Sequence, residues 1–280
     1  MDAQRPQAGM FGNTKDLKMF DDLGPWIPYK GCKQGILDQI YNTIRSLNIP
    51  EPKGIIDAFT GGGSFAYFMA RHGYKVIAND IDPSVIDLHD TCQHRPDLIR
   101  EWGKLYYTKE QFKQWLEVEG PQAALIRSIW SFGNDGRTYL TSTENEQNKI
   151  EEFLRGEAEP NSRFKHVEDI CLLWSRYNLD LEFRCGSYDQ IPVPEGWLGY
   201  YDPPYAGTAG YRCGGFDHEA FYKWALAQPG LVLISEYSMP EGFFLVDEYF
   251  KWVESGRGAR GKAGVERLYA NKPVKKLSLF

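Results

Sequence analysis

A short apolar strand, three consecutive glycines and a helix follow one another between Gly54 and Arg71, and this succession constrains the fold most. The apolar segment 54–58 leads into glycines 61–63, and residues 64–71 have the composition of a helix. Glycine allows a sharp turn and a close approach of the backbone to a bound molecule. A strand, a glycine turn and a helix in this order are typical of a nucleotide-binding βαβ unit. The pattern therefore predicts an α/β fold with a ligand at this turn.

A second strand is predicted at residues 75–78, and it ends in Asn79 and Asp80, 23 residues after Asp57. A spacing of about 20 residues places an acid on a ribose diol, which is found in both NAD and S-adenosylmethionine. Asp80 can also cap the next helix, but Asp82 fits that role better because it is followed by a proline. We therefore assign Asp80, with its neighbour Ile81, to the ligand and Asp82 to the cap.

The apolar run 197–201 leads into Asp202-Pro203-Pro204-Tyr205, at the kind of loop where α/β sheets keep their chemistry. Proline fixes the backbone and has no N–H, so the Asp202 carboxylate and the Pro203 carbonyl form a rigid pair of acceptors. They can accept both hydrogens of a planar amino group, while Tyr205 offers an aromatic face to a flat ring such as adenine. Taken alone, the four residues are also compatible with an ordinary turn.

In this order, the motifs resemble those of the Dam-like, D12-type N6-adenine DNA methyltransferases. Residues 26–34 are similar to the aromatic-x-Gly-Gly-Lys motif of that family, with Tyr29 and Lys33 matching and Cys32 in place of the second glycine. The segment 57–63 resembles the D/E-x-F-x-G-x-G loop around the methionine part of S-adenosylmethionine. Residues 264–272 are similar to the strand that closes the family's sheet, so the resemblance spans residues 26–272.

The resemblance implies a Rossmann-like S-adenosylmethionine-dependent methyltransferase sheet with an inserted, mainly helical target-recognition domain. Together with the ribose assignment, it gives a set of cofactor-binding residues: Tyr29, Lys33, Asp57, Phe59, Gly61, Gly63, Asp80, Ile81, Tyr188 and Asp189. The four residues from Asp202 to Tyr205, Pro204 included, are the expected catalytic loop.

Four parts are predicted along the chain. A mobile arm at 1–20 precedes a catalytic domain at 21–95 and 180–274, a target-recognition insertion occupies 96–179, and a tail forms 275–280. The insertion is predicted to be helical because apolar residues recur at helical spacing in four segments, 109–118, 122–130, 144–155 and 163–177.

Two segments are candidates for contact with nucleic acid. A turn signal at 131–140 can project a hairpin or loop in which Asn134 contacts an adenine edge and Arg137 a guanine edge, or it is a plain surface turn. The net charge of −6 is uneven, since residues 251–276 carry eight basic and two acidic side chains. There, Arg257, Arg260 and Lys262 fit a phosphate clamp, and the alternative is a solvated loop.

Composition narrows the class of protein. Of the residues, 42% are hydrophobic, and no apolar run approaches the length of about 18 residues that is needed to cross a membrane. The start lacks the features of a signal peptide. Five scattered cysteines, without a C-x-x-C pair, disfavour a disulfide framework and a zinc site. We therefore expect a cytoplasmic enzyme, of a bacterial cell or a phage-infected host, that requires no metal.

The predicted reaction is methyl transfer from S-adenosylmethionine to N6 of an adenine flipped out of double-stranded DNA. RNA or protein-amide methylation, and a non-catalytic cofactor- or DNA-binding role, are the alternatives. The end of the chain, Leu277-Ser278-Leu279-Phe280, resembles the peptide with which bacterial DNA-processing proteins hold the sliding clamp, with Lys276 where glutamine is usual. Local packing of Leu279 and Phe280 on the catalytic domain is the other interpretation of this tail.

Overall fold

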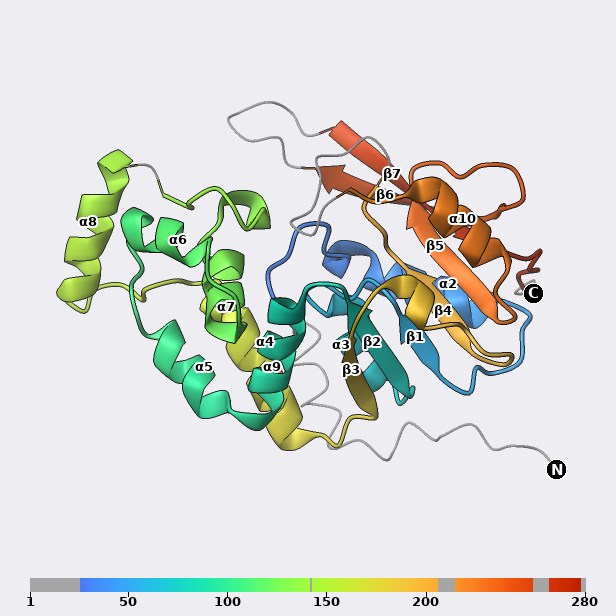
Figure 1. Cartoon of the computed structure of the whole chain (residues 1–280), viewed down its shortest axis with the longest axis horizontal. Coiled ribbons are helices and arrows are strands. Elements are labelled where there is room, and N and C mark those ends of the chain that lie inside the picture. Colours follow the sequence, from blue (N-terminus) through green and yellow to red (C-terminus); the bar gives the residue numbers. More distant parts are fainter. Residues whose placement is uncertain (1–25, 142, 206–214, 254–261, 278–280) are drawn as a thin grey trace. The chain divides into compact units, whose positions relative to one another are not determined.

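The computed structural model describes residues 26–141, 143–205, 215–253 and 262–277 (Figure 1). The chain divides into two compact units. The first comprises Met1–Cys32, Gly61–Gly73 and Asp82–Phe183, and the second comprises Lys33–Thr60, Tyr74–Ile81 and Arg184–Phe280. Within the described part of the chain, no helix is both long enough and apolar enough to span a membrane.

Among the described residues, seven strands form one sheet in the order β3-β2-β1-β4-β5-β7-β6. Their bounds are β1 Ile55–Asp57, β2 Val76–Asp80, β3 Leu181–Cys185, β4 Leu198–Tyr201, β5 Leu231–Glu236, β6 Phe244–Val253 and β7 Lys262–Ala270. β1 pairs in parallel with β2 and with β4, and β4 pairs in parallel with β5. β7 is antiparallel to both β5 and β6. The carboxyl ends of four parallel strands therefore share one edge, which is where such sheets bind ligands.

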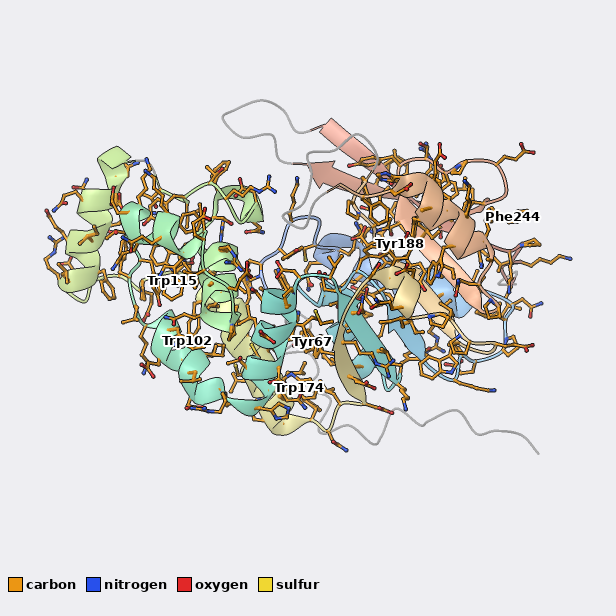
Figure 2. The ribbon with its side chains drawn as sticks, viewed as in Figure 1. Tyr67, Trp102, Trp115, Trp174, Tyr188 and Phe244 are labelled. Atoms are coloured by element: carbon orange, nitrogen blue, oxygen red, sulfur yellow. The ribbon has the colours of Figure 1, made fainter. Side chains whose placement is uncertain are left out.

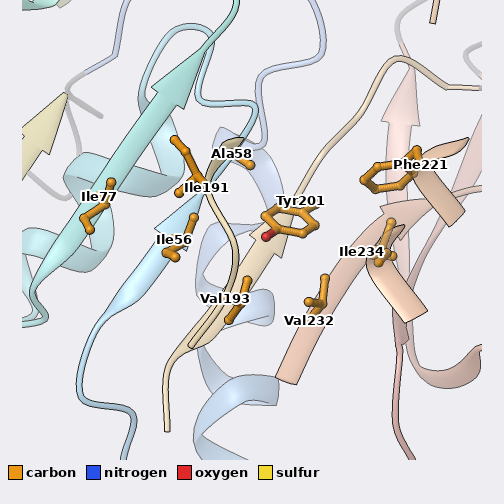
Figure 3. Packing of buried hydrophobic residues seen from close by; sticks show 10 residues of the cluster. Ile56, Ala58, Ile77, Ile191, Val193, Tyr201, Phe221, Val232 and Ile234 are labelled. Carbon is orange, nitrogen blue, oxygen red and sulfur yellow. The ribbon is translucent and has the colours of Figure 1, made fainter. Parts of the chain in front are cut away.

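One face of this sheet is packed in the second unit by α10 (His218–Leu226) and by residues around Val193 (Figure 3). Ile56, Ile77 and Val232 come from three strands of that face, and Phe221 of α10 is fully buried in the same cluster. This unit also contains the 3-10 turns η1 (Gln34–Ile36) and η3 (Tyr188–Gln190) and the helix α2 (Leu37–Ser46).

The first unit is helical. Its helices are α3 Ser64–Arg71, α4 Pro83–His94, α5 Pro96–Gly103, α6 Lys109–Trp115, α7 Pro121–Ile129, α8 Thr143–Leu154 and α9 Phe164–Arg176, with the 3-10 turn η2 at Phe132–Asn134. Tyr67, Trp102, Trp115 and Trp174 are labelled among its side chains in Figure 2. The four helices predicted for residues 109–177 are present, with ends that differ by a few residues. α5 is not predicted from the pattern, because only Arg95 separates it from α4.

Local sequence signals set several helix ends. The predicted cap at Asp82 is confirmed, since its side chain accepts a hydrogen bond from the Ser84 amide and Pro83 opens α4. Thr108 and Gln111 form a capping box at the start of α6. The predicted fold class, a Rossmann-like α/β sheet with an inserted, mainly helical region, is confirmed.

Candidate functional site

Asn79 holds together the loops that leave three strands of the sheet. Its side-chain amide donates to the carbonyls of Ala58 (3.2 Å) and Gly186 (2.9 Å), and its backbone carbonyl accepts from the Thr60 amide (2.8 Å). Next to it, the carbonyl of Asp80 accepts from the Gly186 amide (3.0 Å). The ends of β1, β2 and β3 are thereby fixed to one another. The sequence does not predict that Asn79 links these loops, because there it is only the residue before Asp80.

Several residues predicted to bind the cofactor lie along this edge. Asp80 is partly buried at the end of β2, and the next side chain, Ile81, is 55% exposed although it is apolar. The rings of Tyr188 and Phe59 are stacked with centroids 5.6 Å apart. Asp189 is exposed beside them. An acid, an uncovered apolar side chain and an aromatic pair in one place fit a ligand with a ribose and a flat base.

Asp57, at the end of β1, has an unusual protonation equilibrium. It is 2% exposed, and its burial raises the pKa of the carboxyl group to about 8. The negative charges of Asp202 and Asp80 act in the same direction. At pH 7 Asp57 is therefore mainly protonated. A positive charge placed beside it would lower its pKa and ionise it.

An ion cluster lies where β4 leads into the Asp202 loop. The Lys33 ammonium Nζ is 2.8 Å from Asp202 Oδ1, 2.8 Å from Glu266 Oε1 and 2.7 Å from the Tyr205 hydroxyl. The Tyr205 hydroxyl in turn donates to Glu266 Oε1 at 2.7 Å. The structure thus brings the predicted residues Lys33, Asp202 and Tyr205 together. It adds Glu266, which the sequence presents only as one of two acids in a basic stretch.

Burial and charge compete within this cluster. Burial alone would lower the pKa of Lys33, but the two neighbouring carboxylates outweigh it and the pKa is raised, so the ammonium stays charged. For Asp202, burial is the largest influence and raises the pKa, Glu266 adds to the rise, and Lys33 opposes it. Two carboxylates share one ammonium here, so the cluster retains an excess negative charge.

The rest of the Asp202 loop is held at both ends. The Pro204 carbonyl lies 2.8 Å from Nε2 of His218 at the start of α10. The Tyr205 ring meets Tyr237 edge to face, with centroids 4.7 Å apart. Pro203 is buried between these anchors, and Asp202 retains a 19% exposed side chain. The loop is therefore positioned by His218 of α10, by Tyr237 after β5 and by Glu266 of β7.

In the first unit, the glycine turn has the backbone that its sequence predicts. Gly61 and Gly63 have φ angles of +45° and +76°, in the region that favours glycine. A Cβ at Gly61 would lie 2.7 Å from the ring of Tyr29, and one at Gly62 would overlap the Ile27 carbonyl. Tyr29 and the glycine turn, both predicted to bind the cofactor, are thus in direct contact.

His89 supports this turn from α4, and the sequence gives no sign of it. Its Nε2 lies 2.8 Å from the Gly61 carbonyl and its Nδ1 lies 2.9 Å from the Tyr67 hydroxyl. Burial lowers the pKa of His89 to about 4, so the ring is neutral at pH 7. A neutral ring that donates from Nε2 to Gly61 must accept at Nδ1 from Tyr67. The His89 ring also stacks on the ring of Phe183, with centroids 4.4 Å apart.

Only some of the residues predicted to contact DNA lie in the described part of the chain. Residues 131–140 form a closed loop, with a bridge between Ser131 and Tyr139, that carries the exposed Arg137 and the half-buried Asn134. Asn134 has a φ of +57°, and Asp135 accepts from the Arg137 amide at 2.8 Å. Lys262 opens β7, whereas Arg257 and Arg260 lie outside the described residues.

Part of the predicted tail is described. Leu277 donates from its amide to the Ser46 carbonyl (2.7 Å), and Lys275 accepts from the Asn48 amide (2.7 Å). The Lys276 ammonium lies 2.7 Å from Asp247 Oδ2. Residues 278–280, on which the resemblance to a clamp-binding peptide depends, lie outside the described residues, so that interaction stays a prediction.

The chain matches one protein family and is similar to several solved structures. A family model described as D12 class N6 adenine-specific DNA methyltransferase matches residues 29–224, more than half of the chain. No curated protein sequence matches.

Several solved structures are similar to the chain. A protein of Thermoplasma acidophilum is 14% identical, with 96% of this chain and 100% of that chain covered and a TM-score of 0.41. The rRNA methyltransferase aviRa of Streptomyces viridochromogenes is 10% identical over 87% of each chain, with a TM-score of 0.40. The Pyrococcus abyssi tRNA (uracil-54, C5)-methyltransferase, in complex with S-adenosyl-L-homocysteine, is 14% identical over 85% of this chain and 37% of that chain, with a TM-score of 0.37.

Proposed function

The chain belongs to the D12 class of N6 adenine-specific DNA methyltransferases, and from this premise we propose that it methylates the exocyclic N6 of adenine in double-stranded DNA. It is an S-adenosyl-L-methionine-dependent methyltransferase. The observation that carries the choice of substrate atom is the Asp202-Pro203 acceptor pair, which follows β4 at the carboxyl edge of the sheet. Such a pair suits an amino group with two hydrogens better than a ring carbon or a hydroxyl.

The residues at the sheet edge fit the cofactor. Asp80 offers a carboxylate to the ribose diol, and the exposed Ile81 offers an apolar surface to the adenine. Asp57 is a buried acid that gains from a positive charge nearby, as the methionine part of the cofactor supplies. When bound, S-adenosylmethionine supplies a methyl group on a positively charged sulfur.

Asp202 and the Pro203 carbonyl act on the amino group by orientation. The lone pair of adenine N6 is delocalised into the ring, and two accepted hydrogen bonds turn it toward the methyl group. The methylated nitrogen has one proton too many, and the carboxylate of Asp202 is the adjacent group that can take it. Its raised pKa suits that task.

Adenine N6 is inaccessible inside a duplex, so the base has to leave the stack. Flipping costs a few kcal/mol, and stacking on the Tyr205 ring offsets about 1–3 kcal/mol of that cost. Arg137, which is exposed on the 131–140 loop, reads base edges. Arg257, Arg260 and Lys262 are assigned to the phosphates from the sequence alone. These assignments extend the proposal from the amino group to the duplex.

The test is methyl transfer from labelled S-adenosylmethionine to an adenine-containing duplex, to the same duplex with every adenine replaced by 2-aminopurine, and to an RNA of the same sequence. We expect label on the first substrate alone. Asp202→Ala should abolish transfer and leave cofactor affinity, measured by calorimetry, unchanged. The matched control is Asp180→Ala, an exposed aspartate before β3. Near-normal turnover of Asp202→Ala, or preferential labelling of RNA, would refute the proposal.

A further inference from the structure

We propose that Lys33 and Glu266 are positioning residues for the methyl-accepting side of the site and do not bind the cofactor. Lys33 holds one oxygen of Asp202 and leaves the other for the target amino group, while Glu266 keeps Lys33 and the Tyr205 hydroxyl in place. This assignment rests on the proposed function, because it takes Asp202 as the residue that receives the amino group.

The ammonium group of Lys33 has three hydrogens and three acceptors. Asp202 Oδ1, Glu266 Oε1 and the Tyr205 hydroxyl all lie within 2.8 Å of Nζ. Lys33 is only 4% exposed, so its charge has little access to water and depends on these partners. An ammonium with three acceptors has no hydrogen left for a cofactor, and it cannot leave Asp202 without losing a partner. Its place in the structure is therefore on the acceptor loop.

The contact with Lys33 uses Oδ1 of Asp202, and the carboxylate has a second oxygen. The Asp202 side chain is 19% exposed, which leaves part of the group accessible to a substrate. The lysine holds Oδ1, and the Tyr205 hydroxyl also interacts with the carboxyl group, so the orientation of the carboxylate is restrained. A target amino group can then donate one hydrogen to Oδ2 and one to the Pro203 carbonyl without displacing the ammonium.

Glu266 ties the same cluster to Tyr205. Its Oε1 accepts from the tyrosine hydroxyl at 2.7 Å, and the Lys33 ammonium lies 4.8 Å from the centre of the Tyr205 ring. Glu266 is 5% exposed on β7, which pairs with β6 along its length and with β5 over residues 267–270. Glu266 on β7 thus positions the Tyr205 ring directly and the Asp202 oxygen through Lys33.

The test compares Lys33→Met, Glu266→Gln and the double variant. Lys33→Met leaves the carboxylates of Asp202 and Glu266 without an ammonium. Glu266→Gln leaves the Asp202 carboxylate paired with the Lys33 ammonium. The double variant has the same net charge as the wild type. Removing the ammonium should raise the pKa of Asp202 and removing Glu266 should lower it, by about 1 to 3 pH units each. The charged and titratable groups that face Asp202 are Lys33, Glu266, Tyr205, Tyr200 and Asp57.

We expect the acid limb of the kcat profile to move to higher pH in Lys33→Met and to lower pH in Glu266→Gln. In the double variant the limb should return close to that of the wild type, while kcat stays about 100-fold low because the acceptor is misplaced. Cofactor affinity by calorimetry should remain that of the wild type in all three. Glu248→Gln is the matched control, since this exposed carboxylate on β6 pairs with Arg267 outside the cluster.

Two results would overturn the assignment. One is a loss of cofactor affinity in Lys33→Met with kcat and its acid limb unmoved, which would place Lys33 in the cofactor site. The other is an Asp202 pKa that does not move in opposite directions in the two single variants. That pKa is also measurable without substrate, by carboxyl ¹³C NMR assigned with Asp202→Asn. If the wild type methylates no adenine duplex, the proposed function fails, and the NMR titration still decides the arrangement of the cluster.

Discussion

His89→Phe removes two hydrogen bonds from beneath the glycine turn and preserves the aromatic stack. Phenylalanine has nearly the shape of the imidazole and can stay on the Phe183 ring, 4.4 Å away, but it cannot donate to the Gly61 carbonyl or accept from the Tyr67 hydroxyl. Each lost bond costs about 1 kcal/mol net, and more where a buried group is left unsatisfied. We expect the free energy of unfolding to fall by about 2–3 kcal/mol.

A double-mutant cycle in urea isolates the Tyr67 part of this loss. In His89→Phe/Tyr67→Phe the hydroxyl that depended on His89 is gone, so the double variant should be less destabilised than the sum of the single variants by about 1 kcal/mol. Calorimetry with S-adenosylmethionine gives the functional readout, and affinity should fall because the Gly61 carbonyl loses its orienting donor. Additive effects, or an unchanged cofactor affinity, would refute the account of His89 as the support of the turn.

The same residue has a pH signature. Burial lowers the pKa of His89 to about 4, below the usual value of about 6.5 that the unfolded chain has. Below pH 6.5 the unfolded state gains a proton that the folded state does not, so the stability due to neutral His89 is complete above about pH 6.5 and is lost as the pH falls toward 4. His89→Phe should lack this component of the acid-side slope.

Three further predictions concern other residues. Asp80→Ala should weaken S-adenosylmethionine binding by about 1.5–3 kcal/mol through the lost ribose bonds, and an unchanged affinity by calorimetry would move the ribose contact elsewhere. Arg137→Ala should relax the choice of methylated sequence in host DNA, whereas Arg155→Ala, an exposed arginine on the same unit paired with Glu151, should not; identical methylation maps for Arg137→Ala and the wild type would end the base-reading role. Burial raises the pKa of Asp57 to about 8, so between about pH 4 and 8 the folded state holds a proton that the unfolded state has lost. The free energy of unfolding that this group contributes therefore falls as the pH rises through that range. Stability in urea should therefore decline between pH 6.5 and 8 in the wild type, and Asp57→Asn should remove this decline.

Much of the sheet and of the helices that follow its first two strands is predictable, because the signals are local in the sequence. Apolar runs predict β1, β2 and β4, glycines predict the turn after β1, and the proline after Asp82 predicts the start of α4. The helix predicted at 64–71 has the observed bounds of α3. Each of these signals needs only a few neighbouring residues, so it is present in a single sequence.

The support of the site is not predictable in this way. Glu266 reaches Lys33 only because β7 runs antiparallel beside β5, and no local pattern shows that pairing. His89 and Asn79 act through hydrogen bonds to backbone carbonyls 28 and 21 residues away. The positioning role that we propose for Lys33 is hidden for the same reason: its motif resembles a cofactor segment, whereas its partners lie about 170 to 230 residues later in the chain.

The ion cluster also sets an order of events during synthesis. Lys33 and Tyr205 are separated by 172 residues, and Tyr205 and Glu266 by a further 61. A nascent chain that has emerged as far as β5 contains the lysine and the Asp202 loop but not the carboxylate on β7. Its acceptor loop lacks the contact with Glu266 until the last strand pair has joined the sheet. Under the role that we propose for Glu266, competence for methyl transfer arrives with the final strands. A chain released before them would hold every residue assigned to the cofactor, while Lys33 and Tyr205 would lack their partner on β7.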